Sequence, residues 1–253
     1  MALEYVRETI HLDQVAGDYL ESPFDRRMRG YMMRALAPWM PPDRGDRAPR
    51  ALQMGCFHGD LTVNLAAAYG DLTVVDAQET FLEHTRKRVP SRVRFARSLF
   101  ERWRPAERFD AIFLVHTLEH VIDPVTVLAR AADWLADGGR LFVVVPNGNA
   151  PSRQIAVKMG VIPDLAALTR SDIQHGHRRT YFMDTLERDV RAAGLAAVGA
   201  GGVFFKPLAN FQLDALDGSA IVSEGYMEGC YELGKKYPDL SASIFVVAER
   251  GTP

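Results

Sequence analysis

The chain has few cysteines and no long apolar run. Only Cys56 and Cys230 occur among its 253 residues, which is too few for the disulfide framework of a small secreted protein. Apolar runs such as 141–146 have the length of a strand and fall well short of the roughly 18 residues that a membrane span requires. The first residues also lack the charged start and apolar core of a secretory signal. We therefore expect a cytoplasmic protein without a transmembrane segment.

Neither sign of charge dominates the composition. The chain has 30 lysines and arginines against 32 acidic residues, for a formal net charge of −2. Such a balance provides no bulk attraction to a phosphate backbone or an anionic membrane. We expect a small-molecule partner, with neither nucleic acid nor membrane as partner, and the composition predicts no particular oligomeric state. With 47% hydrophobic residues, the chain can bury the core of one domain.

From residue 51 onward, short apolar segments alternate with segments whose apolar residues recur at helical spacing. This pattern is typical of a parallel sheet with helices on both faces, and we expect most of the strands to be buried. The expected strands are 51–54, 72–76, 92–96, 111–116, 140–146, 196–205 and 243–248. The expected helices are 25–39, 60–69, 124–136, one that aligns Leu186 with Val190 and stops at Gly194, and 223–236. The predicted fold class is α/β, with a doubly wound, mostly parallel sheet.

A glycine turn follows the first expected strand. In doubly wound sheets the ligand lies beyond the carboxyl ends of the strands, and glycine in the first turn lets the backbone approach it closely. Gly55 and Gly59 occupy this turn. Asp76 ends the second strand, 21 positions after Gly55, close to the spacing of about 20 at which an acid accepts hydrogen bonds from ribose hydroxyls. The pair predicts a site for an adenosine-containing cofactor.

The middle of the turn distinguishes two such cofactors. A pyrophosphate loop usually has three close glycines, and here Phe57 stands at the middle position, where it would crowd a diphosphate. The turn therefore favours an adenosyl cofactor over a dinucleotide. A nucleotide-dependent oxidoreductase and a glycine turn in a non-binding α/β domain stay as alternatives, because short glycine motifs recur by chance.

Several segments together resemble class I S-adenosylmethionine-dependent methyltransferases, in the branch that includes the ubiquinone-pathway O-methyltransferases and small-molecule and sugar methyltransferases. The segments are Gly55 to Gly59, Asp76, the run 109–124 with Leu118-Glu119-His120-Val121 and Asp123-Pro124, Gly138-Gly139-Arg140-Leu141, and Pro146-Asn147. The resemblance covers about residues 50–195. It implies a Rossmann-like methyltransferase sheet and S-adenosylmethionine as cofactor.

The fold class and the pattern together divide a single methyltransferase domain, residues 1–253, into four parts. We expect an N-terminal helical cap in 1–49 and a cofactor-binding core in 50–146. A stretch punctuated by proline and glycine, 147–180, is expected to be a lid insertion. The last part, 181–253, should complete the core and contribute to the acceptor site.

The resemblance implies that the glycine turn lies along the methionine part of the cofactor and that Asp76 holds the ribose. The expected cofactor-binding residues are Arg29, Gln53, Gly55, Cys56, Gly59, Asp76, Ala77, Ser98, Leu99 and His116. Arg29 is the candidate partner of the methionine carboxylate, with a place on a solvated helix face as the alternative. Gln53 replaces the acid usual in the family, and its amide cannot hold an ammonium group by charge.

Three histidines are candidates for the chemistry. Methyl transfer requires an acceptor in line with the methyl group and often the loss of a proton, a task suited to histidine near neutral pH. His116 should lie at the tip of the fourth strand, whereas His175 and His177 precede the helix that resumes the core. We expect all three to be catalytic candidates, with lid-anchoring hydrogen bonds as the alternative for the latter two.

A metal ion is an alternative at the same place. His116, Glu119 and His120 have the spacing of an inverted zinc-protease motif, but that motif needs a continuous helix and this one spans a strand end and a loop. The resemblance implies instead that these three residues could hold a divalent ion, as in some ubiquinone-pathway relatives. Such an ion would lower the pKa of an acceptor hydroxyl.

The expected acceptor-binding residues are Arg178, Tyr181 and Asn210, because small-molecule sites combine apolar walls with a few polar groups. The sequence thus predicts methyl transfer to an oxygen atom of a small polar metabolite such as a sugar, a carboxylate or a natural-product scaffold. A nitrogen atom is the less favoured alternative. The departures at Gln53 and Phe57 motivate the alternative of a catalytically silent binding protein with the methyltransferase fold.

Overall fold

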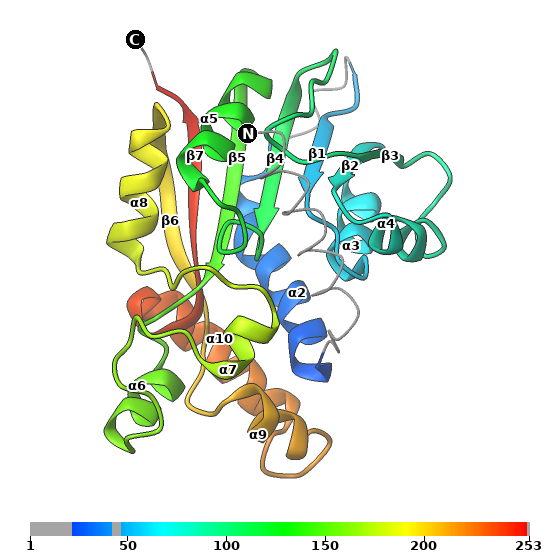
Figure 1. Cartoon of the computed structure of the whole chain (residues 1–253). Coiled ribbons are helices and arrows are strands. Elements are labelled where there is room, and N and C mark those ends of the chain that lie inside the picture. Colours follow the sequence, from blue (N-terminus) through cyan, green and yellow to red (C-terminus); the bar gives the residue numbers. More distant parts are fainter. Residues whose placement is uncertain (1–21, 42–46, 252–253) are drawn as a thin grey trace.

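The computed structural model describes residues 22–41 and 47–251. Its centre is a sheet of seven strands in the order β3-β2-β1-β4-β5-β7-β6 (Figure 1). The strands are β1 (Arg50–Met54), β2 (Asp71–Asp76), β3 (Arg94–Arg97), β4 (Phe109–Val115), β5 (Leu135–Pro146), β6 (Leu195–Phe205) and β7 (Ser241–Arg250). Among the strands that the structure describes, only β7 runs antiparallel to its neighbours. The prediction of a doubly wound, mostly parallel α/β sheet is confirmed.

Helices cover both faces of the sheet and its carboxyl end (Figure 1). They are α2 (Pro23–Leu36), α3 (Asp60–Ala68), α4 (Glu79–Arg86), α5 (Pro124–Trp134), α6 (Pro151–Lys158), α7 (Arg170–Gln174), α8 (Met183–Ala192), α9 (Asn210–Ala215) and α10 (Glu224–Lys236), with short 3-10 turns at Ala37–Trp39 and Pro238–Leu240. Within the ranges described, none of these helices has both the length and the apolarity to cross a membrane.

Each face of the sheet packs on its own hydrophobic core. Along β4, alternate side chains divide between the two: Phe113 belongs to the core under α2, α3 and α10, and Ile112 to the core under α5 and α8. Both are fully buried. Because both faces of a parallel strand are covered, its sequence is a continuous apolar run, which is why the strands could be predicted.

The N-terminal helix follows the predicted spacing. Met28, Met32 and Leu36 recur every four residues and are all buried in the first core. The helix begins earlier than expected, at Pro23, because the Ser22 side chain accepts a hydrogen bond from the Asp25 amide and caps it. The rest of the predicted cap, 1–21 and 42–46, lies outside the described residues.

The boundary between α5 and β5 differs from the prediction. The helix expected over 124–136 ends at Trp134, and the strand expected from 140 already begins at Leu135. The reason is that Leu135 pairs with Phe109 across a bulge in the β4–β5 ladder. Gly138 takes a left-handed φ of +71° near the start of this strand.

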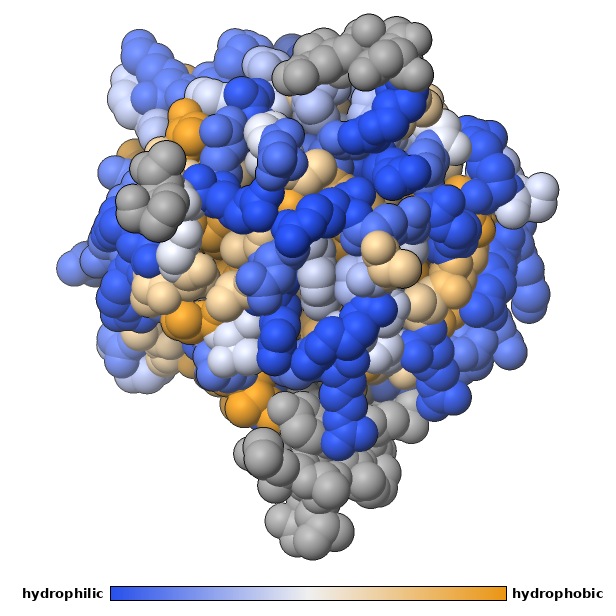
Figure 2. All heavy atoms as spheres, turned by 90° about the horizontal axis from the view of Figure 1, so that it is seen from above, coloured by the Kyte–Doolittle hydropathy of each residue, from blue (hydrophilic) through white to orange (hydrophobic). Residues whose placement is uncertain are grey.

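The end of the molecule at which the parallel strands begin carries many charges. Seen from above in Figure 2, this end is mostly hydrophilic, with hydrophobic residues in scattered patches. Its charges form ion pairs at the surface, such as Arg47 with Asp110 at 2.7 Å and Arg94 with Asp71 at 2.7 Å. The first pair joins the segment before β1 to β4, and the second joins the start of β3 to the start of β2.

Candidate active site

A cavity of about 730 Å³ opens where the parallel strands end. This volume lies within the range of roughly 300–1,000 Å³ that is usual for small-molecule sites. The cavity is lined by the turns after β1, β2 and β4, the ends of β5 and β6, helices α2 and α9, and the segment 147–180. The predicted site residues that line it are Arg29, Gln53, Gly55, Cys56, Asp76, Ala77, Ser98, Leu99, His116, Glu119, His120, His175, His177 and Asn210.

Two residues expected to bind the acceptor lie elsewhere. Tyr181 is 2% exposed, and its hydroxyl donates to Asp189 within the core, at 3.1 Å. The Arg178 side chain donates through Nε to the carbonyl of His120, and its backbone amide donates to the carbonyl of Glu119. Arg178 therefore supports the loop after β4, and Tyr181 is a core residue, so neither lines the cavity.

Glycine at position 55 allows the turn to reach the cavity. Gly55 has φ +84°, and a Cβ there would lie 2.7 Å from the Thr117 hydroxyl oxygen. Phe57 also has a left-handed φ, +46°, which is the backbone conformation that a glycine would adopt there. Its ring stacks on the ring of His58. Gly59 was expected to bind cofactor, but it does not line the cavity: with φ +87° it starts α3.

Asp76 joins the end of β2 to the glycine turn. One carboxylate oxygen accepts from the Cys56 amide at 2.8 Å and the other from the Gln78 amide at 2.9 Å. The side chain is buried, which raises its pKa. Each carboxylate oxygen has a second lone pair, and the residue lines the cavity. Asp76 can thus hold the turn and still accept hydrogen bonds from a ligand.

Two buried amides face the same part of the cavity. Gln53 donates through Nε2 to the carbonyl of Gly55 at 2.9 Å, and its Oε1 has no hydrogen-bond partner within the described part of the chain. The Gln78 side chain is 3% exposed, and neither its Nε2 nor its Oε1 has such a partner among those residues. Buried amides are seldom left unpaired. Gln78 was missed in the sequence, although its place two residues after Asp76 could have indicated it.

The turn after β3 borders the cavity beside Asp76. The Ser98 amide donates to the Asp76 carbonyl at 3.0 Å, and the Ser98 hydroxyl donates to the carbonyl of Leu99. Leu99 and Phe100 supply apolar surface there. This turn provides the flat apolar wall and the polar edge that a purine ring would need.

His116 lies at the tip of β4 in a left-handed conformation, with φ +50°. Its Nε2 is 2.9 Å from the hydroxyl of Ser243 on β7. Burial, reinforced by the charge of Arg29, holds the pKa of His116 well below its usual value. The imidazole is therefore neutral and fixed by a hydroxyl. Arg29 lines the cavity from α2 and so does not lie on a fully solvated helix face.

His177 is held by an acid from the segment 147–180. Its Nδ1 lies 3.3 Å from Asp172. Asp172 caps α7 through Thr169 and also accepts from Arg153 at 3.3 Å. Burial alone would lower the pKa of His177, but the hydrogen bond to Asp172 and the charge of Glu119 outweigh it and raise that pKa. Asp172 was missed in the sequence, although the spacing Thr169-x-x-Asp172 is a capping signature.

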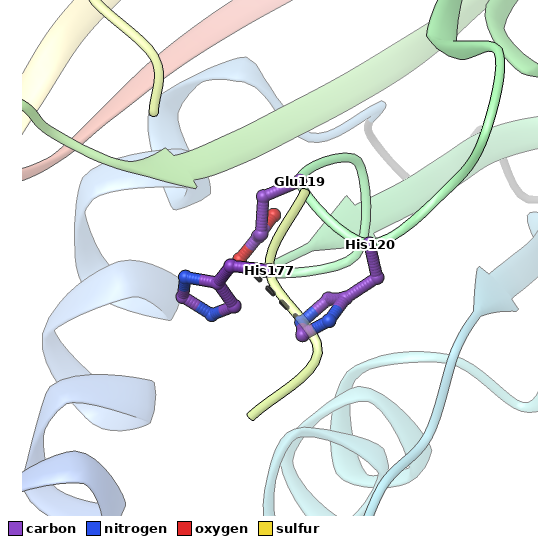
Figure 3. A group of neighbouring side chains, drawn as sticks. All are labelled: Glu119, His120 and His177. Carbon is purple, nitrogen blue, oxygen red and sulfur yellow. Dashed lines mark ion pairs between the residues drawn. The ribbon is translucent and has the colours of Figure 1, made fainter. Parts of the chain in front are cut away.

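Glu119 and His120 meet His177 from the loop after β4, as Figure 3 shows. Glu119 is 1% exposed, and neither carboxylate oxygen has a hydrogen-bond partner among the residues that the structure describes. Burial raises the pKa of Glu119 to about 7 and lowers that of His120 to about 3. The rings of His120 and His177 lie edge to face with centroids 4.8 Å apart. The titratable side chains of Glu119, His120 and His177 are thus packed close together.

The predicted metal ligands are regrouped by the structure. Ligand atoms of Glu119, His120 and His177 lie within 4.8 Å of one another. His116, which was expected in this set, is outside the group and is bonded to Ser243 instead. β4 ends before His116, which takes a left-handed φ of +50° and contacts β7, whereas Glu119 and His120 lie further along the loop that follows the strand.

The side of the cavity away from the glycine turn contains Lys206. Lys206 Nζ donates to Asn210 Oδ1 at 2.7 Å, and Asn210 Nδ2 donates to Asp25 at 2.9 Å. His175 lines the same region, and burial lowers its pKa. Asn210 therefore lines the cavity as expected, with both ends of its amide already bonded to protein groups.

Comparison with known proteins agrees with this geometry. A family model described as a methyltransferase domain matches residues 24–199. The chain belongs to this family. The match begins in α2 and extends through the glycine turn, the histidine cluster and α8 into β6, so it covers most of the residues that line the cavity.

Two named methyltransferases are among the proteins similar to this chain in sequence. The ubiquinone biosynthesis O-methyltransferase of Aromatoleum aromaticum is 29% identical over 175 residues, which cover 67% of this chain and 74% of that protein. The trans-aconitate 2-methyltransferase of Methylobacterium radiotolerans is 36% identical over 106 residues, which cover 41% of this chain and 40% of that protein. The chain is an S-adenosylmethionine-dependent methyltransferase.

A solved structure has the same fold. The N-methyltransferase NodS from Bradyrhizobium japonicum, in complex with S-adenosyl-L-homocysteine, aligns over 97% of this methyltransferase and 99% of its own chain, with a TM-score of 0.58. The two sequences are 16% identical, so the similarity concerns the fold. It confirms the Rossmann-like methyltransferase architecture.

Proposed function

We propose that this methyltransferase transfers a methyl group to an oxygen atom of a small polar metabolite, with His177 as the general base. The observation that carries the proposal is the position of His177. It faces the cavity that contains Asp76 and the glycine turn, and Asp172 holds its ring. The cofactor side and the acceptor side of one reaction therefore open into the same space.

The cofactor side fits S-adenosylmethionine. The absence of a side chain at Gly55 leaves room beside Thr117, and Asp76 has lone pairs for the ribose hydroxyls. Gln53 Oε1, unpaired in the described structure, can accept from the amino group of the methionine part. Gln78 offers a donor and an acceptor near the ribose. Bound S-adenosylmethionine supplies an electrophilic methyl group on sulfur.

The acceptor side provides a base with a defined orientation. Because Nδ1 of His177 pairs with Asp172, Nε2 is the atom that takes the proton of an acceptor hydroxyl. The acceptor oxygen forms the new bond to carbon as the bond between carbon and sulfur breaks, and the proton moves to Nε2. The raised pKa of His177 makes it a stronger base for this proton.

Oxygen is favoured over nitrogen as the methylated atom. The relative that covers two thirds of the chain is an O-methyltransferase by name. A hydroxyl must lose its proton as it is methylated, and the held imidazole serves that need, whereas a neutral amine reacts through its own lone pair. The pairing of His177 with Asp172 is thus best explained by an oxygen acceptor.

Calorimetry with S-adenosylhomocysteine tests the cofactor site. Asp76→Asn keeps the shape of the side chain but removes its charge, and we expect it to weaken binding by about 10-fold to 100-fold, as for the loss of hydrogen bonds to a charged group. Asp71→Asn is the matched control, because it makes the same change at the other end of β2, and it should bind as the wild type does.

Three outcomes would redirect the proposal. Failure of the wild type to bind S-adenosylhomocysteine, or equal binding by Asp76→Asn, would remove the cofactor assignment. Stabilisation of the wild type by a nicotinamide dinucleotide in its place would favour an oxidoreductase. Binding of S-adenosylhomocysteine without turnover of any hydroxylated acceptor in a metabolite panel would favour a catalytically silent binding protein.

A second candidate role for the same cluster is to hold a divalent ion. Two imidazoles and a carboxylate are a donor set that suits Zn²⁺ or Mn²⁺, and neither carboxylate oxygen of Glu119 has a hydrogen-bond partner in the described structure. An ion there would acidify an acceptor hydroxyl. Undiminished turnover after dialysis against a chelator, with metal content below one tenth per chain, would exclude this role and leave His177 as the base.

A further inference from the structure

The end of β6 is bent and locked in place. Phe204 has φ +66°, a conformation that bulky residues rarely adopt. Its ring is fully buried and contacts Phe24 at 5.3 Å and Tyr31 at 5.5 Å between centroids. A Cβ at Gly234 would lie 2.3 Å from the Phe204 backbone nitrogen, so α10 also presses closely on this point. A strained backbone held this firmly is often part of a functional site.

The bend places Lys206 on the wall of the cavity. Its ammonium group donates one hydrogen bond, to Asn210 Oδ1, and no carboxylate of the described residues lies within ion-pair distance. An ammonium group has three donors. Its Nζ also lies 5.8 Å from the centroid of the Phe24 ring. Burial lowers the pKa of Lys206, which reflects the cost of removing the charge from water with one hydrogen bond and one aromatic ring as its neutral partners. The two remaining donors suit an anionic ligand.

The surrounding charges limit which anion fits. Asp172 is already paired with Arg153 and His177, and Asp25 lies beyond Asn210. Both acids act on Lys206 through space. They would therefore repel a doubly charged phosphate more strongly than a singly charged carboxylate. Arg153 also acts on Lys206 and offsets one of the two acids, so the ammonium group suits one singly charged carboxylate.

The topology puts this ligand on the acceptor side. Between β1 and β6 lie β4, β5 and β7, whereas the cofactor residues follow β1, β2 and β3. Lys206 is still close enough to act on His116 at the tip of β4. A molecule held at Lys206 would thus extend toward the histidines, where the methyl group is transferred.

We propose that Lys206 binds a carboxylate of the methyl acceptor, so that the substrates are small molecules with a carboxylate in addition to the hydroxyl that is methylated. Asn210 positions the lysine, and Asp25 positions Asn210. The inference rests on the proposed function, because it assigns the acceptor to the side of the cavity away from the glycine turn.

The test compares two probes that differ by one group. The protein is loaded with S-adenosylhomocysteine, and calorimetry measures its affinity for 3,4-dihydroxybenzoate and for catechol, which has the same hydroxyls without the carboxylate. We expect the wild type to bind the acid at least tenfold more tightly. In Lys206→Met the ratio should fall to about one, whereas Lys206→Arg should keep part of it. Lys235→Met, on the exposed face of α10, makes the same change away from the cavity and should keep the full ratio.

A companion pair, benzoate and phenyl phosphate, should favour benzoate. Equal or unmeasurable affinity of the wild type for the two dihydroxy probes would overturn the inference, as would an acid preference that persists in Lys206→Met. A loss of S-adenosylhomocysteine binding in Lys206→Met would assign the lysine to the carboxylate of the cofactor instead. Failure of the wild type to bind S-adenosylhomocysteine is a different result, since it contradicts the proposed function itself. Thermal melts of each variant are the check that it folds.

Discussion

Charged side chains are exposed and paired at one end of the sheet and buried at the other. Where the strands begin, acids and arginines pair at the surface: Asp71 contacts Arg94, and Asp110 contacts Arg47. Where the same strands end, charged and titratable groups are buried. Asp76 at the end of β2 binds backbone amides, and Glu119, just after β4, has no hydrogen-bond partner in the described structure.

This difference separates stability from function. Exposed ion pairs contribute only about 0–1 kcal/mol each, so the pairs where the strands begin can be lost singly without great effect. A buried carboxyl without a hydrogen-bond partner in the described structure, such as that of Glu119, costs stability. Such groups persist mainly where a ligand or a reaction uses them. The contrast can be tested by matched changes at the two ends, and the largest effect is expected at the end that contains the cavity.

Replacing His177 should have the largest effect on turnover. His177→Gln removes the proposed base but keeps a polar side chain of similar size, and we expect kcat to fall by about 10²-fold to 10⁴-fold, the usual contribution of general base catalysis. Binding of S-adenosylhomocysteine should stay within twofold of the wild type. His84→Gln, on the exposed side of α4, is the matched control and should leave turnover unchanged. A wild-type rate in His177→Gln would remove this residue from the mechanism.

Two glycines, one at each end of the sheet, allow the effect of an added Cβ to be compared directly. Gly55, at the site, and Gly138, before the core of β5, both have a left-handed φ, but a Cβ at Gly55 would meet Thr117 whereas one at Gly138 would meet nothing within 4 Å. Gly138→Ala should cost about 1 kcal/mol of unfolding free energy through backbone strain alone.

Gly55→Ala should cost more than Gly138→Ala and should also weaken S-adenosylhomocysteine binding by tenfold or more, because the turn must move away from Thr117. Urea unfolding and calorimetry on the two variants measure both effects. Equal losses of stability with unchanged binding would show that the turn relaxes around the methyl group and that Gly55 is not needed for close approach.

The sheet and the cofactor side could be predicted because their signals are local. Buried parallel strands are short apolar runs bounded by turns, and Gly55 and Asp76 each stand at the end of such a run. The short helices α4, α6, α7 and α9 were missed because none has more than eight residues, too few for a helical period to be recognised.

The acceptor side depends on contacts between residues far apart in the chain. His177 meets Glu119 across 58 positions, and Lys206 reaches the cavity only because Phe204 bends the end of β6. No spacing in the sequence records these meetings. The residues that follow His177 illustrate the same limit, since Arg178 turns back to the loop after β4 and Tyr181 enters the core.

The smallest effect is expected where the strands begin. Burial alone would raise the pKa of Asp110, but the hydrogen bond from Arg47 and the amide of Arg50 outweigh it and hold the pKa below its usual value. A depressed pKa contributes stability above the unfolded value of about 3.9, and this contribution disappears as the pH falls through the folded pKa.

Asp110→Asn should therefore lose at most about 1 kcal/mol of unfolding free energy at pH 7. The difference from the wild type should shrink as the pH is lowered below about 3.9. It should also shrink in 1 M salt, because exposed charges are screened there. Urea unfolding of the wild type, Asp110→Asn, Arg47→Met and the double variant measures the coupling between the two side chains. A coupling that is large and independent of salt would mean that this pair behaves like the buried groups at the other end of the sheet, and the contrast between the two ends would fail.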